Sequence, residues 1–147
     1  MKIILRNDQR ARPVRVTALR RLILRVCKAL GLDKDTSFSV NFVDEAQIKR
    51  LNRRFFKKSR LTDVISLGYR PRRGGRPRMR GVYDTYLGDV YVCPGRVWTN
   101  AGQYKQPYSG ELNLCVVHGI LHLLGYEDTG PRAKKRMWKK QRELTGL

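Results

Sequence analysis

The alternation of apolar and polar residues along the chain predicts strands and helices in succession. Residues 17–30 repeat apolar side chains at helical spacing and end at Gly31, which predicts an amphipathic helix. Residues 37–43 alternate strictly between apolar and polar, which predicts a half-buried strand. Asp44 follows as the predicted N-cap of a helix that runs to about Phe55.

The rest of the chain continues the same pattern. Residues 1–5, 63–67 and 89–93 are predicted short strands, the last of them closed by Pro94. A final helix opens at Pro131, and its predicted apolar positions are Met137, Trp138 and Leu144. The resulting order, β-α-β-α-β-β-α-α-α, predicts one small α+β domain.

Residues 111–124 form a helix-length run that is apolar on nearly every side, so we expect this helix to be buried. Ser109 is its predicted N-cap and Gly125 its predicted C-cap glycine. The run contains both histidines of the chain, His118 and His122, four positions apart. Side chains at this spacing lie on one helical face, where two imidazoles can bind one metal ion.

Asp128 lies six residues past His122, where a reversed chain can bring its carboxylate to the same ion and leave a fourth position for water. Two alternatives stay open: the histidines are ordinary core residues, and Asp128 is an acidic residue near a helix N-terminus. Cys115 is a further possible ligand, although core packing is the favoured interpretation. Gly119 occupies the position of the general-base Glu in the His-Glu-x-x-His motif of zinc proteases, which disfavours protease chemistry.

The charge of the chain indicates a polyanionic partner. Among 147 residues, 32 Lys and Arg outnumber 12 Asp and Glu, for a net charge of +20. Nucleic acid is favoured over an anionic membrane surface because no basic helix has a clean apolar face, and no apolar run is long enough to cross a bilayer. Cys27, Cys93 and Cys115 lie in apolar runs and are interpreted as reduced core residues of an intracellular protein.

Residues 69–83 form a predicted flexible loop, since their prolines and glycines cannot build a core. The loop contains six arginines and no acidic residue, which favours contact with RNA or DNA phosphates over a merely solvated insertion. The candidate RNA-binding residues are Arg70, Arg72, Arg73, Arg76, Arg78 and Arg80.

Four stretches together resemble a known family: residues 118–126, 87–93 and 61–66, and the pair at 51–52. They are similar to motifs of the YbeY family of ribosomal-RNA maturation factors, which are zinc-dependent endoribonucleases. The resemblance implies a single YbeY-like endoribonuclease domain over residues 1–147, with the Arg-rich loop at about 69–83 as an insertion. It also implies a mixed four-stranded β-sheet covered by helices, with zinc bound by the His-x-x-x-His helix.

The function implied by this resemblance is single-strand-specific cleavage of RNA during small-subunit ribosomal RNA maturation and ribosome quality control, in the cytoplasm. One Zn²⁺ per chain would be bound by His118, His122 and Asp128. The implied partners are ribosomal RNA, the small ribosomal subunit and a ribosomal protein, with no membrane.

Two positions depart from the family pattern. Asp128 stands where the family usually has a third histidine, and Phe56 stands where it has a functional arginine. Arg54, Lys57 and Arg60 are candidates for the missing cation, and the general base is not identified. The departures support an alternative: a catalytically weakened or inactive RNA-binding ribosome-assembly factor with a structural metal. Peptide hydrolysis is a third hypothesis, which the +20 charge disfavours.

Overall fold

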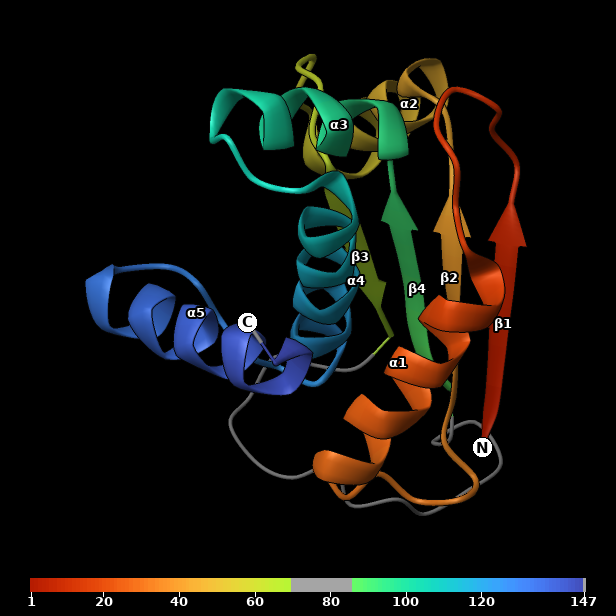
Figure 1. Cartoon of the computed structure of the whole chain (residues 1–147), viewed down its shortest axis with the longest axis vertical. Coiled ribbons are helices and arrows are strands. Elements are labelled where there is room, and N and C mark those ends of the chain that lie inside the picture. The colour runs from red at the N-terminus through yellow and green to blue at the C-terminus, as the bar shows by residue number, and fades with distance from the viewer. Residues whose placement is uncertain (70–85, 147) are drawn as a thin grey trace.

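Figure 1 shows a computed structural model of the chain, which describes residues 1–69 and 86–146. The order of strands and helices is the predicted one. The elements are β1 (Lys2–Asn7), α1 (Val16–Ala29), β2 (Ser37–Phe42), α2 (Glu45–Phe56), β3 (Val64–Gly68), β4 (Tyr86–Val92), α3 (Pro94–Gln103), α4 (Tyr108–Leu123) and α5 (Pro131–Thr145).

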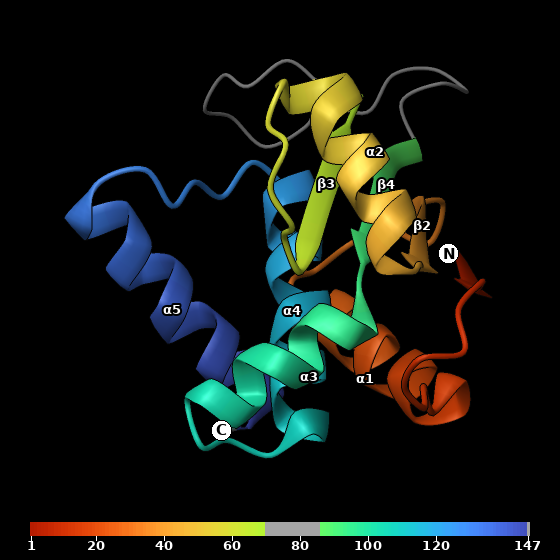
Figure 2. The same ribbon diagram turned by 90° about the horizontal axis from the view of Figure 1, so that it is seen from above.

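The four strands form one mixed sheet in the order β1-β2-β4-β3, as the family resemblance implied. β1 and β4 both pair with β2 in parallel, whereas β3 runs antiparallel to β4 at the edge. Helices α1 and α4 cover one face of this sheet, and α2 lies over the other face near β3 (Figures 1 and 2). The fold is therefore a small α+β domain with α4 packed along the β3 edge.

Strand β2 is more buried than its alternating pattern predicted. Ser39 is only 5% exposed and Asn41 only 7%, although both lie on the polar face. They are buried because β2 lies between two other strands and its polar side chains bond to each other and to β4. The Asn41 amide donates to Ser39 Oγ at 2.8 Å, and the hydroxyls of Ser39 and Tyr86 donate to the Asp89 carboxylate. The prediction of a half-buried strand was wrong on this face.

The predicted cap of α2 is confirmed. The Asp44 carboxylate accepts a hydrogen bond from the Gln47 backbone N–H at 2.8 Å, satisfying a free donor of the first turn. Pro94 has a second role besides ending β4, because it occupies the first turn of α3. There its missing N–H breaks no helical hydrogen bond.

The predicted N-cap of α4 was wrong, and the predicted glycine at its C-terminal end was correct. Ser109 is not the N-cap: Pro107 holds that position, and its carbonyl accepts the first helical bond from Glu111 N at 3.1 Å. Ser109 therefore lies inside the first turn. Gly125 follows the helix with φ +91°, and its N–H bonds to the His122 carbonyl at 3.0 Å. This left-handed turn reverses the chain, as predicted.

The predicted core assignment of the cysteines is confirmed, because Cys27, Cys93 and Cys115 are all buried free thiols. Within residues 1–69 and 86–146, no helix has both the length and the apolar character that crossing a membrane requires.

Candidate metal centre

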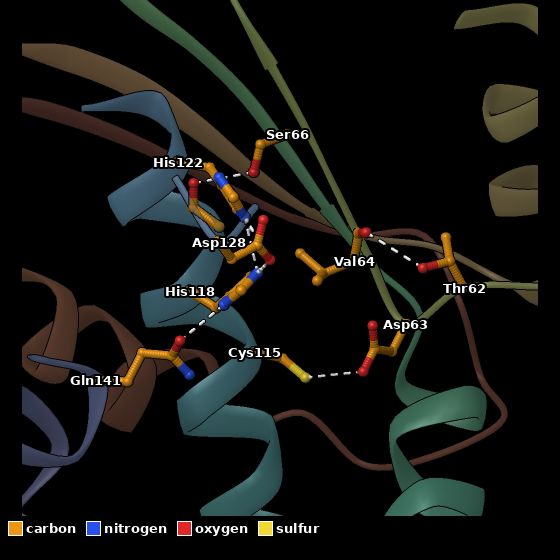
Figure 3. Close-up of polar contacts among 10 residues, drawn as sticks. Thr62, Asp63, Val64, Ser66, Cys115, His118, His122, Asp128 and Gln141 are labelled. Carbon is orange, nitrogen blue, oxygen red and sulfur yellow. Dashed lines mark hydrogen bonds and ion pairs between the residues drawn. The ribbon is translucent and has the colours of Figure 1, made fainter. Parts of the chain in front are cut away.

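Three potential metal ligands converge beside the C-terminal half of α4 (Figure 3). The Nε2 atoms of His118 and His122 lie 2.9 Å apart. Asp128, from the loop between α4 and α5, places its Oδ2 at 3.5 Å from His118 Nε2 and 3.4 Å from His122 Nε2. The side chains of both histidines are about one quarter exposed, at 23% and 25%, so the centre is partly shielded from solvent.

The donor set fits a zinc ion. Tetrahedral zinc with ligand bonds of about 2.0–2.1 Å places its ligand atoms about 3.3 Å apart. The two separations between Asp128 and the histidines match this value, and the separation between the two imidazole nitrogens is slightly shorter. Two imidazoles and one carboxylate leave a fourth position open, as in catalytic zinc sites.

The orientation of His118 depends on α5. Its Nδ1 lies 2.7 Å from Oε1 of Gln141, which is buried at 6% exposed. Because an amide oxygen only accepts, Nδ1 carries the proton and the lone pair of Nε2 points toward the other two ligands. Sequence reasoning missed Gln141, although a signal existed: it lies four residues after Met137, as a polar residue on the apolar stripe of α5.

His122 is held in the form that binds metal. Burial lowers the pKa of its imidazole, the nearby His118 lowers it further, and Asp128 partly opposes both effects. A lowered pKa keeps the ring neutral at physiological pH. Neutral imidazole is the form that a metal ion can bind without displacing a proton.

Asp128 serves no capping role in α5. The N-cap of that helix is Gly130, and its first turn contains no acidic residue. The carboxylate instead faces the two imidazoles, because the turn at Gly125 directs the chain back along α4.

Residue 119 must be a glycine because α4 packs closely against β4 at this position. A Cβ atom at this position would lie 2.4 Å from Val90 Cγ1, inside van der Waals contact. The Gly119 carbonyl also accepts a hydrogen bond from Ser66 Oγ of β3 at 2.9 Å (Figure 3). Helix α4 therefore lies too close to the sheet for the glutamate of a zinc protease.

Cys115 is not one of the three converging ligands. Its Sγ lies 3.5 Å from Oδ2 of Asp63, and burial raises the pKa of the thiol well above its usual value. A buried thiol next to a carboxylate resists deprotonation, so the structure agrees with the interpretation of Cys115 as a core residue.

The family model described as endoribonuclease YbeY matches residues 4–146 of this chain. The chain belongs to the YbeY family. A YbeY protein named endoribonuclease YbeY from Bacillus cytotoxicus is 33% identical over 132 residues, which cover 89% of this chain and 85% of the relative. Another of the same name, from Pelotomaculum thermopropionicum, is 35% identical over 128 residues, 87% of this chain and 82% of the relative.

A solved structure has the same fold. The solution structure of TM1509 from Thermotoga maritima superposes with a TM-score of 0.62 at 27% sequence identity, over 97% of this chain and 86% of that one. The family and fold that the motifs implied are therefore confirmed.

The missing cation of the YbeY pattern has no assigned replacement. Phe56 is the last residue of α2 and is 41% exposed. The guanidinium of Arg54 lies 5.3 Å from the ring centroid of Phe55, and Lys57 caps α2 with φ 53°. The roles of Arg54, Lys57 and Arg60 stay predictions.

The sequence predicted six RNA-binding arginines in the loop at about 69–83. They lie outside the described residues, and their role stays a prediction: Arg70, Arg72, Arg73, Arg76, Arg78 and Arg80.

Proposed function

We propose that this protein is a zinc-dependent endoribonuclease that cleaves single-stranded RNA at the centre formed by His118, His122 and Asp128. The observation that carries the proposal is the convergence of these three ligand atoms, all within 4.8 Å of one another, in a chain that belongs to the YbeY family. The named relatives are endoribonucleases, which supports RNA as the substrate.

The protein contributes position and charge to this chemistry. His118 and His122 would hold the ion through Nε2 and Asp128 through a carboxylate oxygen, while Gln141 keeps the His118 ring oriented. A bound Zn²⁺ supplies a Lewis acid for a phosphate oxygen and lowers the pKa of water. Basic side chains near the centre stabilise the negative charge that develops on the phosphate.

The net charge of +20 supports a nucleic-acid substrate over a peptide. Arginines and lysines bind phosphates by releasing counterions, so RNA affinity should fall steeply with salt concentration. Deleting residues 70–80 should flatten this dependence, and an unchanged slope would show that the loop is a solvated insertion.

The proposed cellular role is maturation of small-subunit ribosomal RNA and ribosome quality control in the cytoplasm. Membership of the YbeY family supports this role. The ribosomal RNA, the small subunit and a ribosomal protein are its proposed partners.

The test measures zinc content of the purified protein together with cleavage of a single-stranded RNA, with and without a chelator. We expect about one zinc per chain and cleavage that stops when the chelator removes it. Stoichiometric zinc and tight RNA binding without cleavage would instead support an assembly factor with a structural metal. That alternative is supported by the two departures from the family pattern, which are Asp128 and Phe56.

A further inference from the structure

A cavity of about 470 Å³ adjoins the candidate metal centre. His118 and Asp128 line one side of it. The other side is formed by α5, through Pro131, Lys134, Lys135, Met137, Trp138 and Gln141. Its volume falls in the range of about 300–1,000 Å³ typical of small-molecule sites. Space for part of a substrate therefore lies directly beside His118 and Asp128, two of the three candidate ligands.

The side chains of α5 that line this cavity occupy one helical face. Lys134, Trp138 and Gln141 follow one another at spacings of four and three residues, which stacks them along the helix. Gln141 anchors the face through its contact with His118. The two other residues are thereby held at the edge of the metal centre.

Trp138 is unexpectedly exposed. The sequence pattern grouped it with Met137 among the apolar positions of this helix, yet Met137 is 2% exposed and Trp138 is 51% exposed. Its indole lines the cavity, and the Arg142 guanidinium lies 5.5 Å from its ring centroid, within cation–π range. Because Trp138 is half exposed and lines the cavity, part of its aromatic surface is available to a ligand.

The lining combines a flat aromatic surface with the exposed cations of Lys134 and Lys135. A nucleotide matches this combination, because its base stacks on aromatic rings and its phosphate attracts ammonium groups. Building on the proposed function, we propose that this cavity binds the nucleotide next to the cleaved phosphate, with its base on Trp138 and its phosphate near Lys134 and Lys135.

This subsite supplies a physical reason for single-strand preference. In a duplex both faces of a base are covered by its neighbours, so stacking on Trp138 requires a base that is already unpaired and free to turn out. A duplex should gain only the electrostatic part of the binding free energy.

The first experiment follows the fluorescence of Trp138 itself. The chain contains two tryptophans, so Trp98→Phe leaves Trp138 as the one reporter in the zinc-loaded protein. Titration with a single-stranded 2′-O-methyl oligoadenylate should quench its emission, and the same strand in a duplex should not. Saturable binding without quenching would overturn the proposal. Adenosine monophosphate that binds as tightly as the oligomer would assign the cavity to a free nucleotide and would also overturn it.

The second experiment measures affinity for the same oligoadenylate. Trp138→Ala should weaken binding about 5- to 150-fold, the range of one base–aromatic stack, while Trp138→Phe retains most of it. Replacing both Lys134 and Lys135 with alanine should lower the salt slope by about 0.7 for each phosphate that the two lysines neutralise in the wild-type protein. Lys139→Ala is the control, because this exposed α5 residue is not part of the cavity lining. Affinity unchanged in Trp138→Ala would overturn the subsite.

These readouts separate the subsite from the proposed function. Quenching of Trp138 in a protein that does not cleave RNA would retain the subsite and reject the nuclease. Cleavage that is unaffected by Trp138→Ala, with no quenching, would retain the nuclease and reject the subsite. Zinc content should be the same in all these variants, because none of the changed residues is a ligand.

Discussion

Helices α4 and α5 form the candidate site together, yet they differ in how much of their surface is buried. α4 is buried on almost every side, between the sheet and the helices that flank it. α5 buries only Met137 and Gln141 and leaves most of its lysines and arginines exposed. The candidate ligands His118 and His122 come from the buried helix, and the residues of the proposed nucleotide subsite come from the exposed one.

The difference in burial follows from the different requirements of metal ligands and of side chains that contact RNA. A metal ion requires ligand atoms within a few tenths of an ångström of their ideal positions, which dense packing provides. Phosphates and bases are contacted by long side chains that lose hydration only when RNA arrives. The contact between His118 and Gln141 links the two helices, so it joins the rigid metal centre to the basic surface.

The largest loss of zinc and of activity is expected from substitutions in α4. The burial of this helix predicts that metal binding depends on both of its histidines. His118→Ala or His122→Ala should remove the zinc and end RNA cleavage, because two remaining ligands form too few bonds. Metal analysis of the purified variants checks this. Lys139→Ala, on the exposed face of α5, should retain the metal. Full zinc occupancy in the double histidine variant would contradict the assignment.

Asp128 tests whether the loop between the two helices completes the centre. Asp128→Ala should weaken zinc binding strongly and end cleavage, whereas Asp128→His should keep the metal because imidazole is also a zinc ligand. Glu127→Ala is the matched control, since it removes the neighbouring carboxylate. Wild-type zinc affinity and activity in Asp128→Ala would show that Asp128 is only a turn residue and does not bind the metal. That result would favour the assembly-factor alternative.

Gln141 tests the link between the helices. Gln141→Leu removes the acceptor for His118 Nδ1–H and should lower zinc affinity about 10- to 100-fold. Gln141→Glu retains an acceptor and should stay near wild type. Competition with a zinc chelator measures both variants. Equal affinity in all three proteins would mean that α4 alone orients His118.

Gly119 tests how tightly α4 is packed. Gly119→Ala should lower the free energy of unfolding by about 1–3 kcal/mol, because its methyl group overlaps Val90. In helix α3, a Cβ at Gly102 meets nothing within 4 Å, so Gly102→Ala should raise stability by up to about 1 kcal/mol. Urea unfolding of both variants gives the comparison. Equal stability of Gly119→Ala and wild type would show that α4 can move away from the sheet.

Local rules were sufficient for much of the molecule. Helical spacing placed His118 and His122 on one face, and Gly125 ended their helix because it adopts a left-handed backbone that other residues avoid. The Asp44 cap was likewise visible, because a cap and its first turn are adjacent in sequence. These features depend on residues within one or two turns of each other, and the sequence alone determined them.

The tertiary structure decided the features that depend on how distant segments meet. Gln141 reaches His118 across 23 residues, and Gly119 must be small because Val90 of another element lies against it. The spacing of apolar residues identifies an apolar stripe on a helix or strand, but it does not say which residues of that stripe a neighbouring element covers. For this reason Trp138, a predicted apolar position of the last helix, is found exposed at the cavity, while Asn41, on the polar face of its strand, is found buried. Packing angles between helices and strands set these outcomes, and no local pattern encodes those angles.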